Sequence, residues 1–273
     1  MTAPDRTVDT GSVRLAVDDR GDDALGVPLV LIHGFTGGRI DFEDVIDPLA
    51  ADRRVVAWDH RGHNDSTNTG HGDSYTFDQL VVDALTTLDH LGLERFHLLG
   101  HSMGGVVAQR LVLDHPARVA SLILMDTMAA PSLSIPEELI DTAVALGRSD
   151  GMGAVADAMD ALTGAQDPPD SSRARIAARN RSKLLKMDVE AFGALAGELR
   201  GFASLLPRLG EIACPTTVLV GELDLPFREP SVAMASAIAG AELVVIEGAA
   251  HCPQEDCPDA WLAAMRHHLA TAD

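Results

Sequence analysis

Short apolar runs that alternate with stretches of helical spacing constrain the fold of this chain most strongly. The runs end in turn residues and read VPLVLIHG, RRVVAWDH, RFHLLGHS, VASLILMDT, TTVLVGELD and ELVVIEGAAH. Continuous apolar runs of this length are typical of parallel strands that helices cover on both faces. Residues 77–91 and 104–115, between such runs, repeat apolar residues at helical spacing. This alternation predicts an α/β fold with a doubly wound, mostly parallel sheet.

The pattern changes between residues 131 and 211. No strand-like run occurs there, and consecutive helices are expected over 131–147, 152–164, 172–187 and 189–206. Strand-like runs then return, and a closing helix is expected over residues 258–270. We therefore predict a core domain formed by residues 1–130 and 212–273, with a helical insertion of residues 131–211.

The charge balance excludes several kinds of partner. The 273 residues include 21 basic and 41 acidic side chains, a net charge of −20. Nucleic acids and anionic membrane surfaces both require a basic face, so we expect neither as a partner. No apolar run approaches the roughly 18 residues of a membrane-spanning helix, and the first residues lack a signal-peptide pattern. With three irregularly spaced cysteines, the chain is expected to be cytoplasmic, and its oligomeric state stays open.

Polar residues stand at the ends of the apolar runs. His33, Ser102, Asp126, Asp224 and His251 each occupy such a position. Because the carboxyl ends of parallel strands meet at one edge of a sheet, these side chains are expected along one rim. A nucleophile, an acid and a base on one rim are what acyl transfer requires.

Residues 100–104, GHSMG, match the G-x-S-x-G nucleophile elbow between a strand and a helix. The turn is so sharp that its flanking residues must be small, which Gly100 and Gly104 satisfy. The helix that follows directs backbone N–H groups toward the site. A glycine-rich turn whose serine caps a helix is the alternative. The preceding strand and the later acid and base favour Ser102 as a nucleophile.

His251 is the predicted base, because it ends a strand-like run in a loop from which it could reach the serine. His101 is expected to support its own loop, and His33 to hydrogen-bond within its own turn. Asp224 is the predicted acid that orients the base, since one strand–helix unit separates it from His251. Asp126 remains the alternative acid.

Two backbone N–H groups, those of Phe35 and Met103, are predicted to form an oxyanion hole. His60, His63 and His71 lack metal-ligand spacing, so neither a metal nor a cofactor is predicted. His267 and His268 stand near the end of the closing helix, where a cation is favourable.

Together these residues resemble the α/β-hydrolase fold superfamily, and within it the Ser-Asp-His serine hydrolases of the carboxylesterase and lactonase kind. HGFTGG resembles the oxyanion loop, WDHRGHNDS the segment after the next strand, GHSMGG the nucleophile motif, GELD the acid loop and GAAH the base loop. By this resemblance, residues 131–211 would form a cap over the pocket. Asn64 departs from a usual glycine, although asparagine tolerates a left-handed backbone. Ala250 and Phe42 also replace residues that are frequent in the family.

The resemblance implies a serine hydrolase that cleaves a small-molecule carboxylic ester or lactone through an acyl-enzyme on Ser102. The same triad could instead hydrolyse a C–C, amide or thioester bond or act as a perhydrolase. A small-molecule receptor on the same scaffold is the alternative from another class.

Several residues of the insertion and its surroundings have two interpretations. Apolar residues there could line the pocket, although at helical spacing they more often pack the helices together. Arg173, Arg175, Arg179 and Arg181 could meet an anionic substrate, but a solvated helix face is the simpler interpretation. Cys252 is either a reactive thiol or an inert packed one. The pocket candidates are Met152, Met159, Leu162, Leu184, Leu185, Met187, Phe192, Leu195 and Phe202.

Overall fold

The computed structural model describes residues 2–22, 26–131, 136–163 and 172–272. Its centre is an eight-stranded sheet with the order β1-β2-β4-β3-β5-β6-β7-β8. Strands β3 to β8 pair in parallel, and β1 and β2 are antiparallel additions at one edge. The predicted α/β fold with a mostly parallel sheet is therefore confirmed. The strands are β1 (Arg6–Asp9), β2 (Arg14–Arg20), β3 (Leu29–Ile32), β4 (Val55–Trp58), β5 (Phe96–His101), β6 (Val119–Met125), β7 (Thr216–Gly221) and β8 (Glu242–Ile246).

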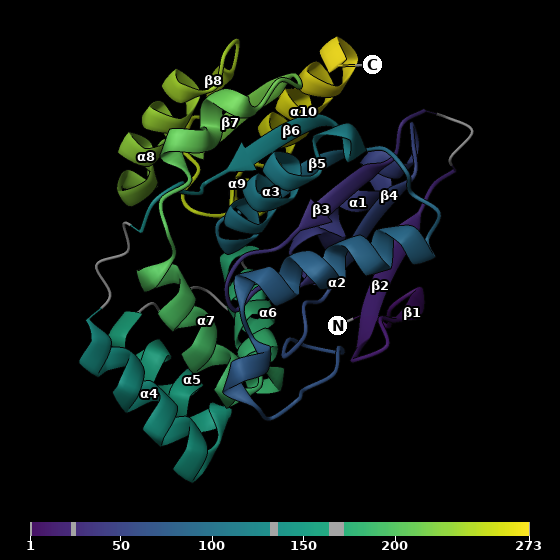
Figure 1. Cartoon of the computed structure of the whole chain (residues 1–273). Coiled ribbons are helices and arrows are strands. Elements are labelled where there is room, and N and C mark those ends of the chain that lie inside the picture. Colours follow the sequence, from purple (N-terminus) through teal and green to yellow (C-terminus); the bar gives the residue numbers. More distant parts are fainter. Residues whose placement is uncertain (1, 23–25, 132–135, 164–171, 273) are drawn as a thin grey trace.

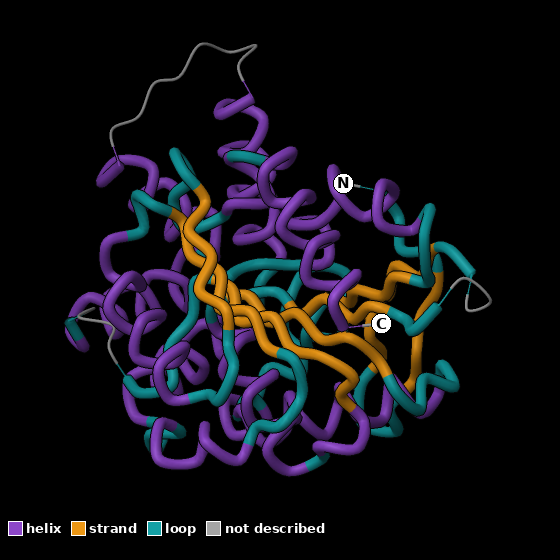
Figure 2. Tube along the Cα trace, turned by 90° about the horizontal axis from the view of Figure 1, so that it is seen from above, coloured by secondary structure: helices purple, strands orange, loops and turns teal. Residues whose placement is uncertain are grey.

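Helices cover both faces of the sheet, as Figure 2 shows from above. Leu29 and Leu31 of β3 pack on one face, and Val30 and Ile32 pack on the other. Because both faces are covered, both sets of alternate residues are apolar, and the strands read as continuous apolar runs. The first face carries α1 (Glu43–Ala50) and α10 (Pro258–Ala272), and the second carries α2 (Phe77–His90), α3 (Met103–Asp114) and α8 (Leu225–Ala237).

The strand order reverses at β3, and this reversal positions the site. From β3 the chain first continues to β4 on one side and later returns to β5 on the other. The loops after β3 and β5 therefore diverge at the carboxyl edge of the sheet. Such a switch point is where open α/β sheets bind their ligands.

Four helices lie between β6 and β7 in sequence: α4 (Glu137–Asp150), α5 (Met152–Thr163), α6 (Ser172–Lys186) and α7 (Val189–Gly201). Figure 1 shows them as one group below the sheet. The strands before and after them belong to the same sheet. None of the helices in the described part of the chain has the length and apolarity needed to cross a bilayer.

The helix boundaries expected in this group need two corrections. The helix predicted from residue 131 begins at Glu137, and residues 132–135 lie outside the described part of the chain. The helix predicted to continue to residue 206 ends at Gly201, where Phe202 turns extended with φ −65° and ψ 148°. Its apolar spacing continues because Phe202 and Leu205 are still buried, although the backbone is no longer helical.

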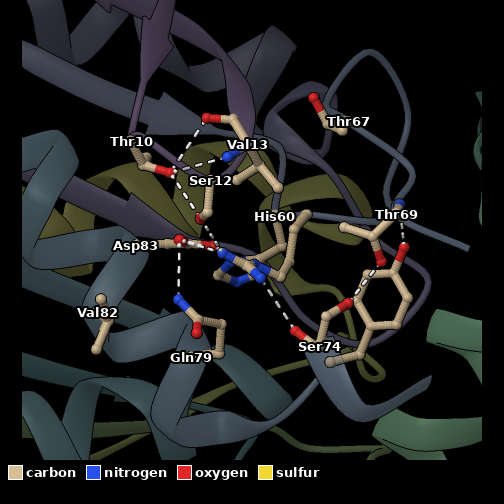
Figure 3. A network of polar contacts seen from close by, with 12 residues as sticks. Thr10, Ser12, Val13, His60, Thr67, Thr69, Ser74, Gln79, Val82 and Asp83 are labelled. Carbon is tan, nitrogen blue, oxygen red and sulfur yellow. Dashed lines mark hydrogen bonds and ion pairs between the residues drawn. The ribbon is translucent and has the colours of Figure 1, made fainter. Parts of the chain in front are cut away.

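A buried ion pair fixes the loop after β4. The guanidinium of Arg61 donates to both carboxylate oxygens of Asp83 on α2, at 2.6 and 2.7 Å. It also donates to Ser12 Oγ and to the carbonyl oxygen of Ser74, and Gln79 donates to Asp83 (Figure 3). The loop is therefore held to α2 and to the turn between β1 and β2.

Candidate active site

Ser102 occupies a strained turn between β5 and α3. Its φ of 52° and ψ of −119° lie in a region that non-glycine residues rarely adopt. The surroundings hold this backbone on both sides, because Ser102 N–H donates to the Met125 carbonyl and Thr127 Oγ1 donates to the Ser102 carbonyl, at 2.9 and 2.6 Å. The strain and the clamp together direct the hydroxyl away from the sheet, as the elbow motif predicts.

The three residues predicted as nucleophile, base and acid form one hydrogen-bonded chain. His251 Nε2 lies 3.0 Å from Ser102 Oγ, and His251 Nδ1 lies 2.7 Å from Asp224 Oδ2. Asp224 is buried, whereas His251 is partly exposed. An imidazole bonded to a buried carboxylate at Nδ1 carries its proton there, which leaves Nε2 free to accept the serine proton.

Two neighbouring residues support His251. His101 Nε2 lies 2.7 Å from the His251 carbonyl oxygen, so His101 supports the loop of the predicted base and not, as predicted, its own loop. Burial lowers the pKa of His101 to about 4, so its ring is neutral and donates to that carbonyl. The ring of Phe227 packs 4.7 Å from that of His251, between centroids.

The loop after β3 approaches Ser102 closely. A Cβ added at Gly34 would lie 2.9 Å from Ser102 Cβ. Phe35, the next residue, lines the same cavity as the serine. Met103 is the first residue of α3, where backbone N–H groups have no partner within the helix. The N–H groups of Phe35 and Met103 thus belong to the two segments that flank the serine hydroxyl.

Asn64 holds this loop from the other side. Its φ of 45° confirms that asparagine adopts the left-handed backbone expected there. Asn64 Nδ2 donates to the Gly37 carbonyl at 2.9 Å and to Asp59 Oδ1 at 3.1 Å. The side chain therefore performs a function that glycine could not perform.

Asp126, the alternative acid, lies behind Asp224. Its Oδ1 accepts a hydrogen bond from Gly221 N–H at 2.9 Å, while the described residues donate nothing to Oδ2. Burial, together with the neighbouring Asp224, raises the pKa of Asp126 to about 9, so the carboxyl group is protonated at neutral pH. Asp126, Asp224 and His251 are the one group of metal-ligand type among the described residues. Since Asp224 and His251 already bond to each other, we interpret these two residues as an acid–base pair, with Asp126 behind them, and not as metal ligands.

A cavity of about 370 Å³ opens above Ser102. The loop after β3 and helices α5 and α6 all contribute residues to its lining. A small or medium-sized organic molecule fits such a volume. From the helices the lining residues are Ala156, Met159, Asp160, Ala177, Asn180, Arg181, Lys183 and Leu184.

Comparisons with known proteins identify the family of this chain. Residues 27–258 match the family model of the alpha/beta hydrolase fold. The chain belongs to the α/β hydrolase fold family. A thermophilic esterase from Thermogutta terrifontis superposes with a TM-score of 0.80 and 29% identity, over 95% of this chain and 94% of that one.

Curated relatives of this α/β hydrolase carry different names. A putative 2-succinyl-6-hydroxy-2,4-cyclohexadiene-1-carboxylate synthase of Bacillus subtilis is 30% identical over 81% of each chain. Proline iminopeptidase of Lactobacillus acidophilus is 40% identical over 110 residues, 39% of this chain and 38% of that protein. The chain thus spans less than two fifths of that relative's length, and the names do not agree on one substrate.

The buried histidines outside the triad of this α/β hydrolase have packing and hydrogen-bonding roles. His33 Nδ1 bonds within its own turn to Gly34, as predicted, and its Nε2 accepts from His60 N–H. Burial lowers the pKa of His33, His60 and His63, so their packed rings are neutral. The prediction for His268 was wrong: it is buried against Thr217 and Ser121, and burial lowers its pKa to about 4, so it carries no cation to the helix end.

The basic run on α6 is also more than a solvated face. Arg179 donates to Glu255 at 2.6 Å and to Asp44 at 3.0 Å, which ties α6 to the core. Arg181 pairs with Asp157 and Asp160 of α5. These arginines are therefore engaged in ion pairs between elements.

The pocket candidates divide into lining and packing residues. Met159 and Leu184 line the cavity, whereas Leu185 is 48% exposed. The side chain of Leu162 lies outside the described residues. Cys252 lines the cavity as well, but burial raises the pKa of its thiol and so disfavours the reactive thiolate. The other candidates are buried: Met152, Met187, Phe192, Leu195 and Phe202.

Sequence reasoning missed a buried ion pair at this site, formed by Lys183 and Asp41. Both line the cavity with Ser102, and Lys183 donates to Asp41. The rarity of lysine was the one available signal, because only two of the chain's 21 basic residues are lysines.

Proposed function

We propose that this chain is a serine hydrolase that cleaves a small-molecule carboxylic ester or lactone through an acyl-enzyme on Ser102. The single observation that carries the proposal is the chain from Ser102 Oγ to His251 Nε2 and from His251 Nδ1 to Asp224 Oδ2, at 3.0 and 2.7 Å. A serine hydroxyl is a weak nucleophile unless a base accepts its proton, and this arrangement supplies the base.

The reaction would proceed in two halves. Ser102 Oγ attacks the carbonyl carbon while His251 Nε2 takes the hydroxyl proton, and Asp224 stabilises the resulting imidazolium. The N–H groups of Phe35 and Met103 donate to the oxyanion of the tetrahedral intermediate. His251 then protonates the leaving alcohol. Water, deprotonated by the same imidazole, attacks the acyl-enzyme and releases the acid.

Helices α5 and α6 would act as part of a cap, residues 131–211, over a core of residues 1–130 and 212–273. Their contribution to the lining of the cavity, which they share with Phe35 and Ser102, supports this division. The ion pairs of Arg179 with Glu255 and Asp44 would hold the cap closed over the core.

The esterase match over nearly the whole chain supports ester chemistry. The same pocket would also serve the alternatives, which are hydrolysis of a C–C, amide or thioester bond, perhydrolysis, and ligand binding by a receptor that does not turn its ligand over. The free cysteines Cys214, Cys252 and Cys257 support a cytoplasmic location.

Hydrolysis of p-nitrophenyl esters of rising acyl length tests the proposal. We expect turnover that declines once the acyl chain outgrows the cavity, and a loss of at least about 10³-fold in Ser102→Ala and His251→Ala. Equal turnover in the parent chain and in Ser102→Ala would refute the proposed nucleophile.

A further inference from the structure

One of the chain's two lysines is buried beside the proposed nucleophile. Lys183 lies on α6, its side chain is 6% exposed, and it lines the same cavity as Ser102. Lys186 lies almost one turn later on the same helix, where it is 42% exposed and pairs with Asp65. Burial of an ammonium group is unfavourable unless its charge and its donors are satisfied, so the position of Lys183 requires an explanation.

Asp41 satisfies the charge of Lys183. The ammonium donates to Asp41 Oδ1, and Asp41 Oδ2 accepts from Gly38 N–H at 3.0 Å. Although burial lowers the pKa of Lys183, the carboxylates of Asp41 and Glu255 outweigh this effect and raise it, so the side chain stays protonated. The pair therefore presents an ammonium group with no net local charge, fixed against the glycine-rich loop that carries Phe35.

The donors of Lys183 are not all used. An ammonium group has three N–H donors, and among the described residues Lys183 makes one hydrogen bond, to Asp41. Because the side chain is nearly buried and lines the cavity, the cavity is the place from which an acceptor can reach the remaining donors. Buried donors without partners are unfavourable, which favours an acceptor on whatever occupies the cavity.

We propose that Lys183 is a specificity-determining residue that donates a hydrogen bond to a neutral oxygen atom of the substrate, outside the scissile ester group. This inference rests on the proposed function of Ser102. A neutral oxygen is favoured over a carboxylate because Asp41 already balances the ammonium charge. The net charge of −20 on the chain also repels anions. The enzyme would therefore prefer esters with an ether, carbonyl or hydroxyl oxygen over hydrocarbon esters of the same size.

Pairs of esters that differ by one ether oxygen in place of one methylene test this preference. Ethyl 3-methoxypropanoate and ethyl ethoxyacetate match ethyl pentanoate on the acyl side. On the alcohol side, 2-ethoxyethyl acetate and 3-methoxypropyl acetate match pentyl acetate. Hydrolysis is followed in a pH-stat, and each ether ester is expressed as a ratio of kcat/KM to its hydrocarbon match. The two series show on which side of the ester the oxygen lies.

We expect at least one ratio to fall by about tenfold or more in Lys183→Met, as the loss of a hydrogen bond to a charged donor predicts. The same ratio should stay unchanged in Lys186→Met, the control on the exposed lysine. Comparing one ratio between variants cancels the intrinsic reactivity of the esters and any general loss of activity. Ratios that agree within about twofold between the parent chain and Lys183→Met would overturn the proposal.

Asp41→Asn provides a second variant, because Lys183→Met leaves the buried Asp41 carboxylate without its partner. Asp41→Asn keeps the lysine but removes the balancing charge, so hydrolysis of monoethyl succinate relative to ethyl pentanoate should rise. If this relative rate does not rise in Asp41→Asn, the neutral-pair argument is overturned. A preference of the parent chain for monoethyl succinate over every ether ester would overturn it as well.

If the folded parent chain hydrolyses none of these esters, the proposed function fails and this inference fails with it. Turnover with unchanged ratios refutes this inference alone.

Discussion

Gly104→Ala should damage the site through a displacement that the structure allows us to estimate. A Cβ at Gly104 would lie 2.4 Å from the carbonyl oxygen of Ile32 and 2.5 Å from that of His33, whereas ordinary contact begins at 3.4 Å. The carbonyl groups of Ile32 and His33 cannot move aside easily, because β3 is hydrogen-bonded to β5. The start of α3 must therefore move by about 1 Å. Overpacking against backbone atoms costs about 3 kcal/mol, at the upper end of the usual range.

The same movement displaces the Met103 N–H, a proposed oxyanion donor. A misplacement of about 1 Å typically lowers the rate about 100-fold, so kcat/KM for a p-nitrophenyl ester should fall by that factor. Urea unfolding measures the stability of the same sample. Gly197→Ala is the control, because a Cβ there meets nothing within 4 Å in α7, and it should stabilise the chain by about 0.5–1 kcal/mol. If Gly104→Ala matched the parent chain in both assays, our account of the elbow would be refuted.

Three further predictions concern buried charges and titrating groups. Arg39→Met should lower the free energy of unfolding by about 3–5 kcal/mol in urea, because it leaves two buried carboxylates unpaired. Burial lowers the pKa of His268 from 6.5 to about 4 in the folded chain. Between about pH 4 and pH 6.5 the unfolded chain therefore binds a proton at His268 that the folded chain does not bind. The free energy of unfolding of the parent chain, measured relative to that of His268→Gln, should therefore fall as the pH is lowered from 6.5 to about 4. A difference between the two chains that stays constant over this range would contradict the prediction. Asp224→Asn should lower kcat by about 10³–10⁴-fold at pH 7. Asp126→Asn should change kcat by no more than about threefold, because Asp126 is already protonated. If Asp126→Asn had the larger effect, Asp126 would be the acid of the triad.

The sequence predicted those features that depend on local pattern. The apolar runs identified the strands of a two-sided sheet because both faces are buried. The rim residues Ser102, Asp224 and His251 were found because turns at the carboxyl ends of parallel strands converge. The edge strand β1 and helix α1 were not predicted, since Arg6–Asp9 has mostly exposed residues and Pro48 interrupts the helical spacing of α1.

Contacts between distant segments could not be read from pattern. Lys183 and Asp41 lie 142 positions apart, on α6 and on the segment between β3 and α1. His268 looked like a helix-end cation because its partners, Ser121 and Thr217, lie on other elements. Such pairs follow from how the elements pack, which periodicity does not specify.

The most direct test of the central claim is whether Ser102 is an activated nucleophile. The purified chain is labelled with a fluorophosphonate probe, and the adduct is mapped by peptide mass spectrometry beside Ser102→Ala and His251→Ala. We expect one adduct, on the peptide that contains Ser102, and its loss in both variants. A well-folded parent chain that takes no label, or an adduct that persists in Ser102→Ala, would contradict the account.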